Sequence, residues 1–170
     1  MSIKNKIFIT GRPGVGKTTI LMKIVKELRS KNINVTGFYC PEIRKGTNRV
    51  GFKIVSISSG KEAMLASTEQ KGGVKIGKYS VVLNEEFVKS LELEIFNNPQ
   101  LITIDEIGPM ELSVPSLKAL IKRILDSEIP LFAVVHRSIK LGGEIYEITE
   151  KNRENLFYYL SKKVLELVNQ

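Results

Sequence analysis

Apolar residues recur along this chain in two spacings, and the alternation between them predicts an α/β fold. Uninterrupted short apolar runs are typical of strands buried on both faces, and they predict strands at 6–10, 35–40, 101–105 and 131–135. Apolar residues that return every three or four positions predict helices at 19–31, after Asn84, after Ser113 and at 152–168. Because strands alternate with helices, we expect a mostly parallel sheet with right-handed crossovers.

Three segments depart from this alternation. Residues 43–58 predict a β-hairpin, since a turn signal at 45–48 is followed by alternating apolar residues, and this hairpin either covers a binding site or extends the sheet. Residues 144–148 alternate in the manner of an edge strand. Residues 61–80 are rich in glycine and lysine with weak periodicity, so we expect mostly loop, and a flexible cover is one possible role.

A glycine-rich motif lies between the first predicted strand and the first predicted helix. It fits G-x-x-x-x-G-K-[ST] and consists of Gly11, Arg12, Pro13, Gly14, Val15, Gly16, Lys17 and Thr18. Its glycines allow several N–H groups to point into one concavity at a helix start, which suits the charge of a triphosphate. Lys17 is expected to reach the β- and γ-phosphates, and the Thr18 hydroxyl is expected to bind Mg²⁺.

Composition narrows the class of protein further. The 170 residues predict one domain, 1–170, and no apolar run approaches the length of a membrane span. One cysteine, Cys40, and one histidine, His136, exclude an internal disulfide and disfavour a zinc site. With no signal-peptide hydrophobic block, a cytoplasmic enzyme is the default expectation.

The net charge of +8 is unevenly distributed. Residues 1–78 carry +12 and residues 79–170 carry −4. A basic half attracts polyanions, and nucleotides or nucleic acid both meet that description, while a lysine-rich solvated surface explains it equally well. Nucleic acid is therefore a partner that the charge permits and does not require.

Two acidic residues follow the predicted strand at 101–105. The Asp105 carboxylate is expected to bind Mg²⁺, and Glu106 is placed to deprotonate a water in line with the γ-phosphate. Asp105 to Gly108 also spell D-x-x-G, as in GTP-binding switch proteins. Those proteins read guanine with an N-K-x-D segment, and none occurs in this sequence, which makes a GTP-specific switch an unlikely class.

Cations near the same sheet edge are candidates for stabilising transition-state charge. Arg137 follows the strand at 131–135 and is the first candidate, with a structural ion pair as the equal alternative. Arg12, Arg44 and Arg49 are weaker candidates. His136 is interpreted as a polar strand-end residue, and Glu111 as a helix-start carboxylate in preference to the partner of a cation.

Five segments together resemble a known family. They are G-R-P-G-V-G-K-T-T at 11–19, G-F-Y-C-P-E-I-R at 37–44, R-V-G-F-K-I-V at 49–55, G-K-Y at 77–79 and D-E-I-G-P-M-E-L at 105–112. Their order and content resemble the small P-loop nucleoside-triphosphatases of thermophilic bacteria and archaea, which include the animal cancer-related nucleoside-triphosphatase. The resemblance implies a three-layer, RecA- or AAA-like α/β domain that hydrolyses several nucleoside triphosphates with Mg²⁺.

The resemblance also implies nucleotide contacts from the 11–18 loop with Thr19, and around 101–108, where Asp105, Glu106 and Gly108 lie. We therefore predict a monomeric, Mg²⁺-dependent hydrolase of ATP, GTP, CTP and UTP. In it Lys17 and Glu106 are catalytic with Arg137 as a stabiliser, while Thr18 and Asp105 are metal ligands. Two alternatives stay open: a nucleoside or nucleotide kinase with residues 44–78 as a lid, and a nucleotide-switched nucleic-acid-binding module.

Overall fold

A single mixed β-sheet runs through the computed structural model, which describes residues 4–170. Residues 1–3, which the one-domain prediction includes, lie outside the described residues. The strand order is β10-β1-β9-β8-β2-β4-β5-β7-β6, with β3 paired to β4. Among the described residues the strands are β1 (Lys6–Gly11), β2 (Val35–Tyr39), β3 (Glu42–Lys45), β4 (Asn48–Ser56), β5 (Glu62–Ser67), β6 (Lys75–Ile76), β7 (Tyr79–Val81), β8 (Leu101–Ile107), β9 (Leu131–Val135) and β10 (Glu144–Ile148).

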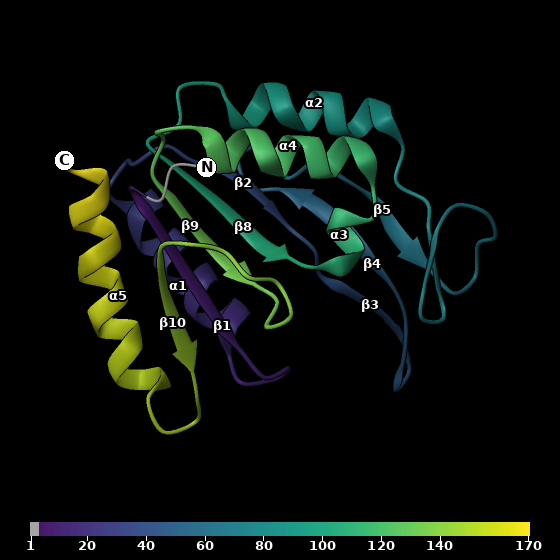
Figure 1. The fold of residues 1–170 in the computed structure, drawn as a ribbon, viewed down its shortest axis with the longest axis horizontal. Helices are drawn as coiled ribbons and strands as arrows, with labels where there is room; N and C mark the ends of the chain where they lie inside the picture. The colour runs from purple at the N-terminus through teal and green to yellow at the C-terminus, as the bar shows by residue number, and fades with distance from the viewer. Residues whose placement is uncertain (1–3) are drawn as a thin grey trace.

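The five strands from β10 to β2 are all parallel, and this part of the sheet confirms the predicted fold class. β1 pairs with β10 and β9, β9 pairs with β8, and β8 pairs with β2. Parallel strands end at one edge, so the segments that follow β1, β8, β9 and β10 leave the sheet on the same side (Figure 1). That edge is where ligands are expected in an open α/β sheet.

Helices cover both faces of the parallel part and produce three layers (Figure 1). α1 (Lys17–Ser30) and α5 (Arg153–Val168) bury their apolar faces against one side of the sheet. α2 (Glu85–Ile95), the short α3 (Pro109–Leu112) and α4 (Pro115–Asp126) lie on the other. The predicted cap of α2 is confirmed, because the Asn84 side chain accepts a hydrogen bond from the Phe87 amide at 2.8 Å.

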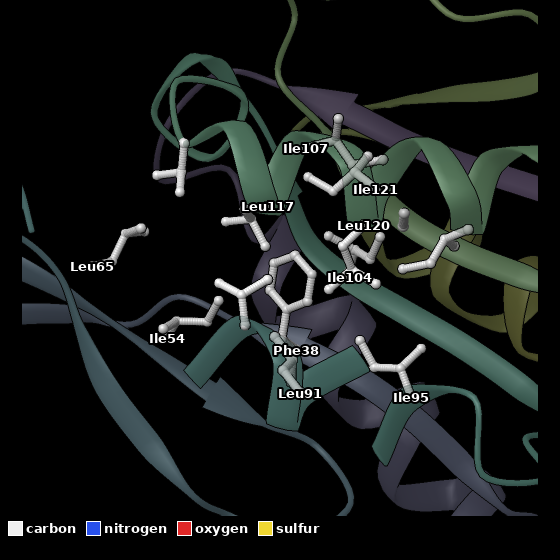
Figure 2. Close-up of a cluster of buried hydrophobic side chains, with 14 of the residues drawn as sticks. Phe38, Ile54, Leu65, Leu91, Ile95, Ile104, Ile107, Leu117, Leu120 and Ile121 are labelled. Carbon is white, nitrogen blue, oxygen red and sulfur yellow. The ribbon is translucent and has the colours of Figure 1, made fainter. Parts of the chain in front are cut away.

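The two apolar layers are filled by side chains that alternate along the buried strands. In the α2–α4 layer Phe38 is fully buried, and Ile54, Leu91, Ile104 and Leu120 surround it (Figure 2). The layer beneath α1 and α5 holds Ile9 of β1 with Phe132 and Val134 of β9, whereas the intervening residues of these two strands, Phe8, Ala133 and Val135, lie in the α2–α4 layer. Apolar residues therefore face both sides of β1 and β9, as the uninterrupted runs in the sequence predict.

The antiparallel part of the sheet is larger than predicted. The hairpin of β3 and β4 is present, and it extends the sheet through the β2–β4 pair. The prediction of mostly loop at 61–80 is wrong for three segments, because β5 pairs with β4, and β7 pairs with β5 and β6. β6 and β7 have two and three residues, which is too short for a clear period, and β5 buries its last three residues in succession without alternation.

The helix predicted after Ser113 is confirmed as α4, and Val114 is the residue that precedes it. One helix was not predicted: α3, of four residues after Gly108, is too short for a periodic signal. Residues 144–148 do form an edge strand, since β10 ends the sheet order.

Candidate active site

The glycine-rich segment forms a tight loop between β1 and α1. Gly11, Gly14 and Gly16 have φ values of 152°, 77° and 108°, in the region that disfavours residues with a Cβ atom. Gly16 precedes α1 and no side chain caps the helix. The amides of the first helical turn, which includes Thr18 and Thr19, therefore keep hydrogen-bonding capacity for an anion.

Lys17 folds back over this loop. Its Nζ donates a hydrogen bond to the Gly11 carbonyl oxygen at 2.7 Å, so the two ends of the motif are joined. The Lys17 ammonium also lies near enough to Asp105 to lower the pKa of that carboxyl group. β8 lies two places from β1 in the sheet, and its Asp105 is therefore close to the loop that follows β1.

Asp105 is buried, and the Thr18 side chain lies near enough to its carboxyl group to lower the pKa of that group. Burial is the largest effect on its pKa, which rises to about 6, with the Glu106 charge adding to the rise while Thr18 and Lys17 oppose it. A cation beside Asp105 would favour the ionised form. The geometry thus joins an acid and a hydroxyl at the loop, as the sequence predicts.

Glu106 leaves the strand ladder immediately after Asp105. The pairing register with β9 shifts between Asp105 and Ile107, and the Glu106 side chain is half-buried. Gly108 follows, and a Cβ atom there would lie 3.0 Å from Glu106 Oε1 and 2.9 Å from Glu111 Oε1. A glycine at position 108 is therefore what allows these two carboxyl groups to approach the same backbone.

Glu111 is a third acid at this site. It lies in α3 and is 5 % exposed, so it is a helix-start carboxylate, as preferred from the sequence, but a deeply buried one. Burial, together with the charges of Glu106 and Asp105, raises the pKa of Glu111 to about 8, while the Glu111 backbone amide and the Cys40 thiol oppose the rise. Within residues 4–170 it forms no ion pair with a cation.

Residues that follow β9 leave the sheet at the same edge as the phosphate loop. The His136 amide donates to the Ile107 carbonyl oxygen at 2.9 Å, and its Nδ1 accepts from the Ser138 amide at 3.1 Å. His136 is thus a strand-end polar residue, as interpreted from the sequence. Arg137 is exposed and, among the residues described, has no carboxylate partner.

The arginines of the hairpin differ from those that follow the parallel strands. Arg44 and Arg49 in the hairpin are both paired with Glu42, at 2.9 and 3.2 Å, so they share one carboxylate. Arg12, Arg137 and Arg153 lie after β1, β9 and β10 and have no ion pair within the described part of the chain.

Sequence reasoning missed one residue at the loop, Arg153. Its Nη1 donates to the Val15 carbonyl oxygen at 3.5 Å. The sequence does contain one indication of this residue. Arg153 is the first residue of α5, at the positive end of the helix dipole, and a cation is disfavoured there unless it has another role.

The oxygen donors present fit a small divalent cation. The Asp105 carboxylate and the Thr18 hydroxyl are hard ligands of the kind Mg²⁺ prefers, and phosphate oxygens and water commonly complete its shell. No group of three or more His, Cys, Asp or Glu side chains suited to a metal occurs in residues 4–170. The fit is therefore to a cation shared with a ligand and not to an all-protein cage.

A hollow of about 340 Å³ lies elsewhere, between α1 and the end of β4. Its lining includes Met22, Arg29 and Tyr39 and contains no residue of the phosphate loop, so it is distinct from the candidate active site. No helix in residues 4–170 has the length and apolar character that crossing a bilayer requires.

Comparison with known proteins identifies the family to which this chain belongs. The sequence profile of a family described as NTPase matches residues 6–161. The chain belongs to this NTPase family. It is 58 % identical over 152 residues to a protein of Sulfolobus acidocaldarius named nucleoside-triphosphatase THEP1, with 89 % of this chain and 88 % of that protein covered.

More distant members of the NTPase family agree. A Thermotoga maritima protein of the same name is 42 % identical over 163 residues, covering 89 % of this chain and 90 % of its own length. The crystal structure of THEP1 from Aquifex aeolicus has a TM-score of 0.75 at 28 % identity, covering 94 % of this chain and 98 % of its own. The solution structure of a human cancer-related nucleoside triphosphatase also has a TM-score of 0.75, at 26 % identity. The match covers 94 % of this chain and 97 % of the human one. The family resemblance and the fold class predicted from the sequence are confirmed.

Proposed function

We propose that this protein hydrolyses nucleoside 5′-triphosphates to diphosphates and phosphate with Mg²⁺, and that it accepts several bases. The observation that carries the proposal is the meeting of Lys17, Thr18 and buried Asp105 at one sheet edge. The names of its relatives support the same reaction. A loop for phosphate, two oxygen ligands for a cation and a nearby carboxylate are the parts that phosphoryl transfer to water requires.

The substrate is held by the phosphate loop. Backbone amides of residues 11–18 and of Thr19 donate to the phosphates, and Lys17 pairs with the β- and γ-phosphate charge. Thr18 and Asp105 would hold Mg²⁺. When bound, Mg²⁺ would neutralise part of the phosphate charge.

Glu106 is the proposed general base. It takes a proton from a water molecule as the water oxygen bonds to the γ-phosphorus, and the bond from the γ-phosphorus to the bridging oxygen breaks, leaving the diphosphate. Arg137 is the proposed stabiliser of the charge that develops on the transferred group. Its lack of a carboxylate partner in residues 4–170 supports this role, as does its place after β9.

The kinase alternative has less support. It uses residues 44–78 as an arginine-bearing lid, yet most of these residues lie in strands of the sheet, and Arg44 and Arg49 are bound to Glu42. The nucleic-acid-binding alternative still depends on charge alone. The monomeric state, the cytoplasmic location and the one-domain boundaries of 1–170 stay predictions from the sequence.

Glu106→Gln tests the proposed mechanism. Glutamine keeps the size of the side chain and cannot accept the proton, so we expect Mg²⁺–ATP binding to persist. Phosphate release should fall by about 10² to 10⁴, or about 3–5 kcal/mol. Glu86 is an exposed acid in α2, and Glu86→Gln is the matched control. It should leave both Mg²⁺–ATP binding and phosphate release unchanged.

Asp105→Asn should behave differently, because it removes a metal ligand: activity and the response to Mg²⁺ should weaken together. Hydrolysis by Glu106→Gln within a few fold of the parent protein would contradict the assignment of the base. Dependence of phosphate transfer on an added acceptor would favour the kinase alternative.

A further inference from the structure

Arg153 lies against the outside of the phosphate loop. Its guanidinium donates to the Val15 carbonyl oxygen, and its Cδ atom is 3.9 Å from the position a Cβ atom on Gly16 would take. The residue comes from α5, 138 positions along the chain from Val15. Its approach to the loop is therefore a product of the tertiary fold and not of local sequence.

A turn between β10 and α5 holds Arg153 in this position. The Thr149 amide donates to Asn152 Oδ1 at 2.8 Å, and the Asn152 amide donates to Thr149 Oγ1 at 3.2 Å. The Arg153 amide bonds the Thr149 carbonyl oxygen at 3.0 Å. Just before the turn, a Cβ on Gly11 would lie 2.6 Å from the Ile148 carbonyl oxygen. Segment 148–153 thus packs against both ends of the loop.

The strand order places Arg153 and the acids on opposite sides of the loop. β8 with Asp105 and Glu106 lies beyond β9 on one side of β1, whereas β10, whose end leads through the 149–152 turn to Arg153, lies on the other. A triphosphate whose γ-phosphate faces Glu106 must direct its nucleoside end away from β8. This step rests on the proposed function, and it brings the nucleoside to the side that carries Arg153.

Within residues 4–170, the charge of Arg153 is not compensated by an acidic side chain. No carboxylate in the described residues forms an ion pair with it, although Glu154 is its neighbour in sequence. It also stands at the first position of α5, where the helix dipole disfavours a cation. An exposed, planar cation that is held in place by a hydrogen-bonded turn is suited to a ligand.

We propose that Arg153 contacts the nucleoside of the bound triphosphate, with its guanidinium plane against the base. Guanidinium groups stack on aromatic faces, and every nucleobase presents such a face. The contact strengthens binding without distinguishing one base from another. It supplies affinity for the nucleoside at a site that has no guanine-reading segment.

The experiment compares two ligands that differ in the nucleoside. Binding of the β,γ-imido analogue of ATP and of inorganic tripolyphosphate, both with Mg²⁺, is measured by calorimetry on the full chain. Arg153→Ala should weaken binding of the ATP analogue about tenfold, as expected for loss of a stacked base, and that of tripolyphosphate by less than about twofold. Lys151→Ala removes an exposed charge from the same turn, and it should leave the ratio of the two affinities unchanged.

Arg153→Lys keeps the charge but lacks the plane, so binding of the ATP analogue should stay weakened. An equal loss for both ligands, or no loss for either, overturns the proposal, and so does full restoration by lysine. Arg153→Gln, which retains an amide donor for Val15, repeats the comparison if the alanine variant unfolds. Lys17→Ala separates the two hypotheses: if it binds both ligands like the parent, the phosphate-loop assignment itself is wrong.

Discussion

At the scale of single residues, Glu111 is a buried acid that forms no ion pair with any cation between residues 4 and 170. Its pKa of about 8 means that the folded protein retains a proton there which the unfolded chain releases near its ordinary pKa of 4.5. The folded state binds more protons between these values, so stability falls as the pH rises towards 8 and levels off above it. Asp105 acts in the same direction, but only up to about pH 6.

We therefore predict that the free energy of unfolding, measured with urea in the absence of nucleotide, decreases between pH 6 and pH 8. The slope should approach about 1.4 kcal/mol per pH unit, the value for one proton. Glu111→Gln should flatten this slope, because glutamine does not titrate and can still accept a hydrogen bond from Cys40. A parent protein with equal stability at both pH values would contradict a protonated Glu111.

The proposed role of Arg137 concerns turnover and not stability, because the charge that it stabilises develops only in the transition state. We predict that Arg137→Ala lowers kcat by at least about tenfold while the affinity for Mg²⁺–ATP changes little, as expected for a group that acts on transition-state charge. Lys140→Ala, exposed in the same segment, is the control. A lower unfolding temperature with normal turnover would instead identify Arg137 as structural.

Individual site residues differ in how far the sequence reveals them. Lys17, Thr18 and Asp105 are found from a motif and from the end of an apolar strand, because both features are local. The burial of Glu111 and the contact of Arg153 with Val15 depend on residues far apart in the chain. No local pattern encodes such proximity, although the position of Arg153 at a helix start is a signal in retrospect.

At the scale of elements, the pairing of β2 with β8 requires a glycine at position 37. Gly37 has a φ of 129°, and a Cβ atom there would overlap the Thr103 carbonyl of the neighbouring strand β8. We predict that Gly37→Ala destabilises the protein by at least about 3 kcal/mol, since steric overlap adds to backbone strain. Urea denaturation of the variant and the parent gives the difference.

Gly46, in the turn between β3 and β4, is the matched control for this prediction. Its φ is also positive, at 61°, but a Cβ atom would meet nothing within 4 Å. Gly46→Ala should therefore cost only about 1 kcal/mol, from the backbone alone. Equal costs for the two substitutions would show that the crowding at Thr103 does not matter.

Whole elements were predictable where they were long or had a clear period. The parallel strands, α1, α2, α4 and α5 all carry such patterns, and so does the alternating edge strand β10. The strands between 61 and 80 carry none, since β6 has two residues and β7 three. Their strand character comes from pairing with β4 and with one another, which is a tertiary effect.

At the scale of the whole molecule, substrate breadth follows from which parts of the chain surround the loop. Lys17, Asp105 and Glu106 all act on phosphates or water, and the sequence has no N-K-x-D segment for guanine. We predict kcat/KM values for ATP, GTP, CTP and UTP within about tenfold of one another, a spread of about 1.4 kcal/mol. A phosphate-release assay with the four substrates measures this, and a thousandfold preference for one of them would contradict it.

The pairing of β1 has a consequence for how the protein is made. The strand that leads into the phosphate loop pairs on both sides with late segments, Lys6 with Leu131 and Ile7 with Glu144. During synthesis, β1 has no strand partner until β9 has left the ribosome, and the loop lacks its contact with Ile148 until β10 follows. A nascent chain therefore gains its nucleotide site only after residues 131–148 have been synthesised, and such distant pairing predicts slow folding.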